Sequence, residues 1–396
     1  MKKFFYKLTA IIIAVIMLLP IGFEAFAEEN EPTSEKNLFG IADGSMNLNC
    51  KSAILMEATT GTILYSQNAE EALPPASVTK IMTLLLIMEA IDAGTVRVDD
   101  VLFISANAAS MGGSQVFLEE GEQMKVEDLL KSVVIASAND AAVALAEYVS
   151  GSVDAFVAKM NAKAAELGMT ATKFENVTGL DDTAENHLTS AKDIALMSCE
   201  LVKHPLILQY SSIWMDTIRD GTFGLTNTNR LVRFYKGCTG LKTGSTSKAG
   251  FCVSATAERD GLSLVCVIMG AESRDIRNAA ATTLLDWGFA NFALFKEDAG
   301  ISEAIAVKGS AVREITASYP SFSCVVRREE LSKIEKVMTL AKNITAPTPT
   351  KEKIGQVTYR VGEREIGTVD ICTDREIKRI GFFEILWQIF AKSLLI

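Results

Sequence analysis

The sequence predicts a mixed α/β (α+β) protein built on an antiparallel sheet with a helical subdomain inserted into it. Strand-like patterns occur at residues 52–66 and again at 240–270, whereas helical patterns dominate between them. Strands from both ends of a segment that join one sheet make a discontinuous domain, which we place at residues 38–293. Residues 296–373 then change to short alternating runs between turns, which predict a small C-terminal β domain.

Residues 1–27 have the features of a secretory signal peptide. Three lysines precede the apolar stretch from Leu8 to Leu19, and Ala25-Phe26-Ala27 forms a small-x-small cleavage pattern. The alternative, an uncleaved anchor helix, is disfavoured because the apolar run is short for a membrane span. We therefore expect an exported protein.

The charge balance argues against nucleic acid as a partner. The chain of 396 residues has 39 basic and 49 acidic residues, a net charge of −10. Removal of residues 1–27 takes away three lysines and Glu24, which leaves 36 basic and 48 acidic residues. Binding to phosphates requires clustered Lys and Arg, and no basic run of that kind is present.

Cysteine and histidine usage makes a metal or cofactor site improbable. The seven cysteines form no Cys-x-x-Cys pair and no ladder of close spacings, so neither a zinc ribbon nor a disulfide scaffold is expected. Whether Cys238 and Cys252 form a bridge is left open. His187 and His204 are the only histidines, and we expect a surface role for both. No cofactor and no metal are therefore expected.

The elements of the large domain follow in order. The stretch "SAILMEATTGTILYSQN" has two apolar runs around Thr59-Thr60-Gly61, which indicates a hairpin. Helical patterns include "VTKIMTLLLIMEA", "KVEDLLKSVVIASA", "DAAVALAEYV" and "VDAFVAKMNAKAAELG". Strand patterns return at "GLKTG", "GFCVSATAERDG" and "LSLVCVIMGAE", and "RNAAATTLLDWGFANF" is predicted as a last helix.

Residues 378–396 predict an amphipathic helix on a membrane surface. Apart from Ser393, the polar residues after Arg379 fall on one narrow stripe: Gly381, Glu384, Gln388 and Lys392. The 17 residues from Ile380 to Ile396 would make roughly 25 Å of helix, which barely spans a bilayer, so we expect the helix to lie in the interface. The alternative is a helix that packs on its own protein.

A serine and a lysine at helical spacing mark the candidate chemistry. Lys80 lies inside the apolar run "VTKIMTLLLIMEA", one turn after Ser77. Pro74-Pro75 cannot continue a helix backwards, so Ser77 should lie near the helix N-terminus, where free amides favour an anion. Burial lowers a lysine pKa, so Lys80 is predicted to be a neutral amine that takes the serine proton.

Two further short motifs strengthen this pair. The "SAND" stretch places Ser137 and Asn139 between two helical patterns, and "KTG" places Lys242 at the start of a strand motif. Ser-x-x-Lys, Ser-x-Asn and Lys-Thr-Gly in this order are a set used by acyl-enzymes. Ser45-Met46-Asn47 and Ser105-Ala106-Asn107 match Ser-x-Asn as well, but only 137–139 follows a buried run and precedes a helix.

With these motifs the chain resembles the low-molecular-weight penicillin-binding proteins, the serine-type D-alanyl-D-alanine carboxypeptidases. The likeness covers nearly the whole chain and includes "TSKAG" after "KTG" and "WGF" in the last helix. It implies a penicillin-binding/β-lactamase-like transpeptidase fold. It also implies peptidoglycan stem peptides ending in D-Ala-D-Ala as substrates, β-lactams as covalent inhibitors, and a place on the outer face of the cytoplasmic membrane.

The resemblance assigns roles to individual residues. Ser77 is the acylated nucleophile and Lys80 its base, while Ser137 passes a proton to the leaving D-alanine. The substrate-binding residues that the resemblance implies are Asn139, Lys242, Thr243, Gly244, Ser245 and Arg277, with Lys242, Thr243 and Arg277 at the terminal carboxylate. From the requirements of acyl transfer, the backbone amides of Ser77 and Ser245 are candidates for the oxyanion hole.

Two other functions stay open from the sequence. A β-lactamase needs an additional carboxylate to activate the deacylating water, and Glu175 is a candidate by position. The second is a catalytically idle β-lactam sensor or a structural wall-binding protein. The β domain and the amphipathic tail argue against the lactamase, and the absence of a spanning helix with a partner domain argues against the sensor.

Overall fold

The computed structural model describes residues 39–394 except 40, 47 and 181–183, and for residues 388 and 392–394 it describes the backbone alone. The predicted signal peptide, residues 1–27, therefore lies outside the described residues.

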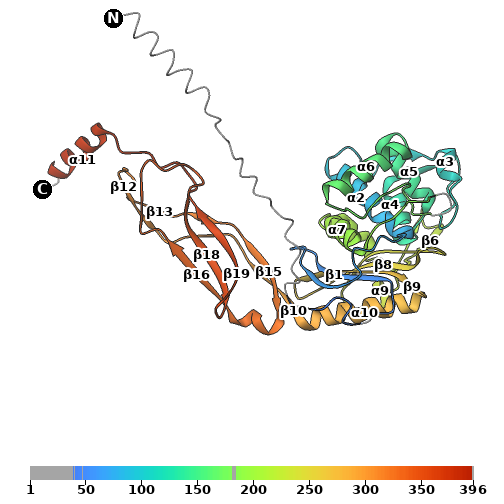
Figure 1. The fold of residues 1–396 in the computed structure, drawn as a ribbon. Coiled ribbons are helices and arrows are strands. Elements are labelled where there is room, and N and C mark those ends of the chain that lie inside the picture. The colour runs from blue at the N-terminus through green and yellow to red at the C-terminus, as the bar shows by residue number, and fades with distance from the viewer. Residues whose placement is uncertain (1–38, 40, 47, 181–183, 395–396) are drawn as a thin grey trace, which may run out of the picture. The chain divides into compact units, whose positions relative to one another are not determined.

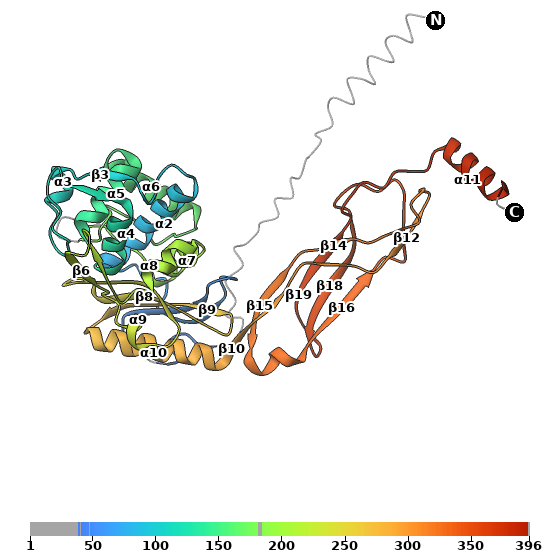
Figure 2. The ribbon, with the colours of Figure 1, turned by 180° about the vertical axis from the view of Figure 1, so that it is seen from behind.

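Five antiparallel strands form the central sheet, in the order β2-β1-β9-β8-β7 (Figures 1 and 2). The N-terminal hairpin joins the later strands through β1, where Ile54 lies opposite Val267 of β9. The predicted sheet assembled from residues 52–66 and 240–270 is therefore confirmed. The strands span Ser52–Glu57 (β1), Ile63–Gln67 (β2), Cys238–Thr246 (β7), Gly250–Arg259 (β8) and Leu262–Ala271 (β9).

The segment between β2 and β7 forms a helical layer on one face of this sheet (Figure 1). At its centre lies α2, whose residues Lys80 to Met88 are all buried, because apolar side chains occur around its whole circumference. The helices span Lys80–Asp92 (α2), Ala106–Ala109 (α3), Val126–Ile135 (α4), Asn139–Ser150 (α5), Val153–Glu166 (α6), Ala191–Leu201 (α7), Pro205–Ser211 (α8) and Leu231–Phe234 (α9).

Two small hairpins lie within the same segment. The first pairs Val101–Phe103 (β3) with Gln123–Lys125 (β4), and the second pairs Met215–Ile218 (β5) with Phe223–Thr226 (β6). The second hairpin is followed by Asn227 and Thr228, which line the cavity described below.

Helix α10 (Arg274–Asn291) covers the opposite face of the sheet (Figures 1 and 2). The Ser273 side chain caps its first turn by accepting a hydrogen bond from the Ile276 N–H. A Cβ added at Gly288 would lie 2.6 Å from Leu55 and 2.8 Å from Leu264. The glycine of the "WGF" stretch is therefore needed for the helix to approach the sheet this closely.

The C-terminal region is a β structure with its own apolar core. The stacked pair Phe322 and Tyr359 has ring centroids 4.4 Å apart, and both contact Phe295. One sheet has the order β11-β14-β19-β18-β16, a second the order β13-β12-β17, and β10 pairs with β15. The strands span Phe292–Glu297 (β10), Gly300–Ile301 (β11), Ile305–Lys308 (β12), Glu314–Ile315 (β13), Ser318–Tyr319 (β14), Phe322–Arg327 (β15), Ile334–Leu340 (β16), Asn343–Thr345 (β17), Lys353–Val361 (β18) and Arg364–Cys372 (β19).

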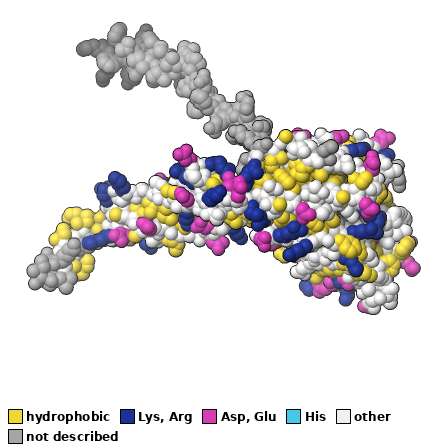
Figure 3. Space-filling model, turned by 90° about the horizontal axis from the view of Figure 1, so that it is seen from below, with side chains coloured by type: hydrophobic (Ala, Val, Ile, Leu, Met, Phe, Trp, Pro, Cys, Tyr) yellow, Lys and Arg dark blue, Asp and Glu magenta, His cyan; other side chains and the backbone are white. Residues whose placement is uncertain are grey.

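The last element is α11 (Phe382–Leu394), and its large apolar side chains are exposed. Phe383 is 82% exposed and Trp387 69% exposed, and hydrophobic side chains gather near the C-terminal end in Figure 3. Among the described helices no single one is long and apolar enough to cross a membrane, although the bent pair α5 and α6 passes by length and composition together. Most of α5 is buried in the large domain.

Candidate active site

Ser77 and Lys80 lie where the chain enters α2. Ser77 belongs to a short 3₁₀ turn, Ala76–Thr79, and Lys80 is the first residue of α2. Sequence reasoning placed Ser77 near the start of an α-helix; the tighter 3₁₀ turn stacks residues three apart almost directly above one another. Nζ of Lys80 consequently lies 2.9 Å from Oγ of Ser77.

Lys80 is fully buried, and three oxygen atoms surround its side-chain nitrogen. Besides contacting Ser77, its amino group donates to Oδ1 of Asn139 at 2.6 Å and to the backbone carbonyl of Thr178 at 3.0 Å. Burial lowers the pKa of Lys80 well below its ordinary value, and the nearby charge of Lys242 lowers the pKa further, while Asp140 opposes the shift. This arrangement favours a neutral amine next to the serine hydroxyl.

Ser137 lies in the turn between α4 and α5 with a strained backbone. Its φ is +64°, a left-handed conformation that a non-glycine residue adopts at a cost of about 1 kcal/mol or more. Its buried hydroxyl has no hydrogen-bond partner within the described part of the chain, and it lines the same cavity as Ser77. A hydroxyl held in this way remains available to a ligand.

The loop of residues 112–114 holds Asn139 in place. Its side-chain amide donates to the Gly112 carbonyl at 2.7 Å, and its backbone N–H donates to the Ser114 carbonyl at 2.7 Å. Gly113 lies against it with φ +77°, and a Cβ there would be 2.7 Å from the Asn139 amide nitrogen. These contacts leave Oδ1 of Asn139 directed to Lys80.

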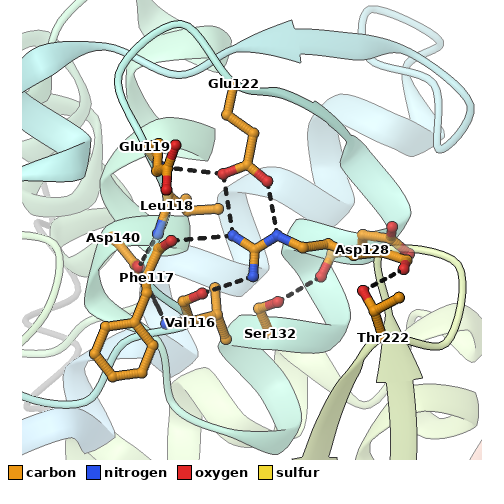
Figure 4. Close-up of polar contacts among 10 residues, drawn as sticks. Val116, Phe117, Leu118, Glu119, Glu122, Asp128, Ser132, Asp140 and Thr222 are labelled. Atoms are coloured by element: carbon orange, nitrogen blue, oxygen red, sulfur yellow. Dashed lines mark hydrogen bonds and ion pairs between the residues drawn. The ribbon is translucent and has the colours of Figure 1, made fainter.

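Figure 4 shows how the same loop is tied to its surroundings. The Asp140 carboxylate accepts the backbone N–H groups of Val116 at 3.0 Å and Leu118 at 3.1 Å. From the other side, Arg219 at the end of β5 donates to the Val116 carbonyl at 2.8 Å and binds both carboxylate oxygens of Glu122, at 2.7 and 3.0 Å. Arg219 thereby connects the β5–β6 hairpin to the loop that holds Asn139.

Strand β7 brings the "KTG" residues beside Ser77. Lys242 is buried, its ammonium donates to the Thr243 carbonyl at 3.0 Å, and burial together with the charge of Arg277 lowers the pKa of Lys242 to about 7. The Thr243 hydroxyl donates to the Thr228 hydroxyl at 2.8 Å. Thr228 and Thr243 line the same cavity as Ser77.

Gly244 allows the strand to touch the turn that carries Ser77. A Cβ at this position would lie 2.7 Å from the Ser77 nitrogen and 2.9 Å from both the Val78 nitrogen and the Pro75 oxygen. The resemblance implies that Gly244 is a substrate-binding residue, and that role stays a prediction. The structure adds a contact of another kind, because any side chain here would strike the backbone of the 3₁₀ turn.

Arg277 lies in the first turn of α10 and is only 2% exposed. Its guanidinium donates to Oδ1 of Asn278 at 2.9 and 3.1 Å and to the Cys252 carbonyl at 3.4 Å. Burial, followed by the charges of Arg274 and other neighbours, lowers its pKa to about 10. An anion next to this group would relieve the mutual repulsion.

One cavity of about 720 Å³ joins these residues. Six of the nine predicted site residues line it: Ser77, Ser137, Thr243, Gly244, Ser245 and Arg277. Lys80 and Asn139 connect to it through their hydrogen bonds, and Lys242 neighbours Thr243. No Asp or Glu is among the described residues that line this cavity. Nor do the described residues contain a group of three or more His, Cys, Asp or Glu that could hold a metal.

The structure places His187 in the interior, so the expected surface role is wrong for this residue. Its Nδ1 accepts the Glu175 N–H at 3.0 Å, so the proton lies on Nε2, which donates to the Thr79 hydroxyl 2.8 Å away. Thr79 immediately precedes Lys80. His204, in contrast, is partly exposed and pairs with Asp92 at 2.6 Å.

Glu175 does not turn its carboxylate to the cavity. It forms an ion pair with Lys173 at 3.1 Å and accepts the Asn186 N–H at 3.2 Å. The carboxylate that a β-lactamase would need is therefore not supplied by this residue.

All seven cysteines lie within the described residues, and none forms a disulfide. Cys238 lies opposite Ala257, whereas Cys252 lies opposite Gly244, six residues further along β7. At about 3.3 Å per residue the two thiols are too far apart for a bridge.

An antiparallel sheet between helical layers, with a buried lysine on a serine hydroxyl beside a Lys-Thr-Gly strand, defines the penicillin-binding protein class. Residues 40–273 match the D-alanyl-D-alanine carboxypeptidase family, and residues 289–379 match the C-terminal domain of penicillin-binding protein 5. The chain belongs to this carboxypeptidase family.

Individual relatives agree with this assignment. The chain is 38% identical over 387 residues to the D-alanyl-D-alanine carboxypeptidase DacF of Bacillus subtilis, covering 96% of this chain and 97% of the relative. The carboxypeptidase DacC of Escherichia coli is 31% identical, with 86% and 88% covered.

Solved structures extend the likeness to three dimensions. Penicillin-binding protein 5 from Haemophilus influenzae superposes with a TM-score of 0.74 at 28% identity, over 84% of this chain and 98% of that one. Penicillin-binding protein D2 from Listeria monocytogenes in its ampicillin-bound form has a TM-score of 0.56 at 32% identity, over 61% of this chain and 98% of that one.

Proposed function

We propose that this carboxypeptidase removes the terminal D-alanine from peptidoglycan stem peptides ending in D-Ala-D-Ala through an acyl-enzyme on Ser77. The 2.9 Å contact between Ser77 Oγ and Lys80 Nζ carries the proposal. A serine hydroxyl is a weak nucleophile until a base takes its proton. The lowered pKa of Lys80 supplies that base.

Acylation begins with attack of Ser77 on the carbonyl of the penultimate D-alanine. Lys80 takes the serine proton, and the backbone N–H groups of Ser77 and Ser245 stabilise the negative oxygen. The close approach that Gly244 permits supports this role, because it brings the end of β7 against the Ser77 turn.

The leaving D-alanine is held and protonated in the same cavity. Lys242, Thr243 and Arg277 bind its carboxylate, and Ser137 passes a proton to its amine. The unpartnered hydroxyl of Ser137 and the buried cations, none of which has a carboxylate beside it in the described cavity lining, support these roles. Water then hydrolyses the ester and restores Ser77.

β-Lactams are proposed to acylate the same serine. The structures of penicillin-binding protein D2 from Listeria monocytogenes with ampicillin and cefotaxime, at 32% and 33% identity, support this extension. A fused lactam offers its amide bond to Ser77 and its carboxylate to the same cations.

We further propose that the exported enzyme is held on the outer face of the cytoplasmic membrane by α11. The exposed apolar side chains of α11 support this role, because they have no comparable cover within the described residues. Lipid contact would remove them from water.

The test is release of D-alanine from a peptide ending in Lys-D-Ala-D-Ala. Ser77→Ala should abolish it, whereas Ser105→Ala, which removes the hydroxyl of a second Ser-x-Asn match, should retain it. Peptide mapping after labelled penicillin should find the label on Ser77. Label on another serine, or full turnover by Ser77→Ala, contradicts the proposal.

A further inference from the structure

Three arginines at the rim of the active-site cavity have no counter-ion. Arg230, Arg233 and Arg274 line the same cavity as Ser77, and all three are exposed. In the part of the chain that the structure describes, none of them forms an ion pair. The arginines that do form ion pairs lie outside the cavity lining: Arg97, Arg219, Arg259, Arg328 and Arg364.

These cations raise the positive potential around Arg277. The charges of Arg274 and Arg230 both disfavour the charged form of Arg277, whereas Cys252 and, more weakly, Asp275 favour it. The chain as a whole has a net charge of −10, so this group of positive charges is opposite in sign to the net charge. Like charges held together in this way create a site for anions.

One rim arginine is also held in place by aromatic rings. The Arg233 guanidinium lies over Trp214, 5.5 Å from its ring centroid, and 5.6 Å from the Phe234 ring centroid. Stacking on a ring face leaves the edge donors of a guanidinium free for a carboxylate. Phe234 is 73% exposed, so its ring also offers apolar surface to a ligand.

The substrate's single terminal carboxylate cannot occupy all these groups. In the proposed reaction Arg277 and Thr243 bind that carboxylate, which belongs to the departing residue. Arg230 and Arg274 are neighbours of Arg277, so they lie on the side of the cavity where the leaving group departs. A second anion there belongs to the leaving group and not to the acyl part.

We propose that Arg230, Arg233 and Arg274 form a second anion subsite, which accepts a departing D-residue whose side chain carries a carboxylate. The inference rests on the proposed function. The bond cleaved is then the amide between D-alanine and an acidic D-amino acid. Phe234 and Trp214 contact the aliphatic part of that side chain, and the arginines bind its carboxylate.

The reaction balances as an ordinary hydrolysis. The Ser77 oxygen bonds to the D-alanine carbonyl carbon, and the carbon–nitrogen bond to the acidic residue breaks. The amine leaves with the proton that Lys80 took and Ser137 passes on. Water then cleaves the ester, which yields a peptide ending in D-alanine and the free serine.

The experiment compares kcat/KM for acyl-Lys-D-Ala-D-Glu and acyl-Lys-D-Ala-D-Gln, which differ in one charge at equal size. We expect the wild-type enzyme to prefer the D-Glu peptide by about tenfold, because two or more guanidinium groups face a single carboxylate. Arg230→Gln combined with Arg233→Gln should bring this ratio close to one. Arg97→Gln, whose ion pair with Asp99 lies outside the cavity lining, should keep the full preference and serves as the control.

The salt dependence of this preference provides an independent test. The preference should shrink between about 50 and 500 mM NaCl, since exposed charges are screened over that range. Equal turnover of the two peptides by the wild-type enzyme, or an unchanged ratio in the double variant, overturns the subsite. The proposed function is judged separately, by D-alanine release from the D-Ala-D-Ala peptide and its loss in Ser77→Ala.

Discussion

The catalytic domain buries three cations, Lys80, Lys242 and Arg277, whereas the terminal helix α11 exposes its phenylalanines and its tryptophan. Each arrangement is unfavourable for a protein alone in water, because charges lose hydration on burial and apolar surface orders or excludes water. The cations are arranged around a cavity without a lining carboxylate among the described residues, and the apolar side chains lie along one helix. The two regions are therefore suited to partners of opposite kinds: an anion for the buried cations and an apolar phase for α11.

The largest effect should come from changing Lys80, the proposed base. Lys80→Arg keeps a positive charge but cannot provide a neutral amine at ordinary pH, so acylation by labelled penicillin should fall by about 10³-fold. Rapid-quench acylation kinetics measure this, with melting temperature as the check on folding. Acylation within a few fold of the wild-type rate would show that Lys80 is not the base.

Removal of residues 378–396 tests whether α11 anchors the enzyme to a membrane. Each methylene that enters lipid contributes about 0.8 kcal/mol, so even half of the exposed α11 surface should bind more tightly than a single acyl chain. Liposome binding of the truncated enzyme should therefore fall by at least about 10³-fold, while turnover of small peptides persists. A full-length enzyme that stays in the supernatant, or a truncated one that still sediments, would disprove the anchor.

The acid and the amide of the terminal D-alanine distinguish the carboxylate site from a merely structural cluster. We expect the wild-type enzyme to hydrolyse the acid about 10²-fold more efficiently, because the amide leaves the buried guanidinium of Arg277 unmatched. Arg277→Ala should reduce that preference to roughly tenfold or less. An acid-to-amide ratio near one in the wild-type enzyme would remove Arg277 and Lys242 from the carboxylate site.

The smallest effect is a pH dependence of stability. The pKa of Lys242 is about 7 in the folded protein against 10.5 as its ordinary value, so between these pH values the unfolded chain binds more protons than the folded one. The free energy of unfolding contributed by this group therefore rises with pH across that window, by about 1 kcal/mol per pH unit. Below about pH 7 the full destabilisation from burying the Lys242 ammonium remains. Above about pH 10.5 the amine is neutral in both states, so this destabilisation is absent.

Lys242→Met should reduce the slope in denaturant titrations between about pH 7 and pH 9, relative to the wild-type enzyme under the same conditions, by about 1 kcal/mol per pH unit, while Lys80 continues to contribute in the same direction. Ser245→Ala, on the same strand but without a charge, is the matched control and should retain it. Identical slopes for the wild-type and Lys242→Met proteins would mean that Lys242 is not held with a lowered pKa.

The sequence alone predicted the residues whose chemical type conflicts with the residues around them. A lysine in an apolar helix, and strand patterns separated by some 170 residues of helical pattern, predicted Lys80 and the sheet, because burial and periodicity leave a direct mark on composition. The 3₁₀ geometry at Ser77 could not be read in the same way, since α and 3₁₀ turns share their residue preferences.

Contacts made through the backbone, or between residues far apart in the sequence, could not be predicted from the sequence. The Thr178 carbonyl that binds Lys80 carries no side-chain signal, and His187 meets Thr79 from 108 residues away. Arg219 lies next to a hairpin turn, where a charged residue normally indicates solvent. Only the folded chain shows that it joins that hairpin to the loop holding Asn139.

The backbone contact at Gly244 limits the substitutions that could give resistance to β-lactams. Strand β7 meets the Ser77 turn without any side chain between them, so the strand cannot shift outward without moving the nitrogen of Ser77 or opening a gap beside it. A mutant in which β7 moved to exclude a β-lactam would also disturb Ser77, the proposed nucleophile. Resistance by substitution should therefore arise at the cavity rim, where side chains can change while the joint between strand and turn stays intact.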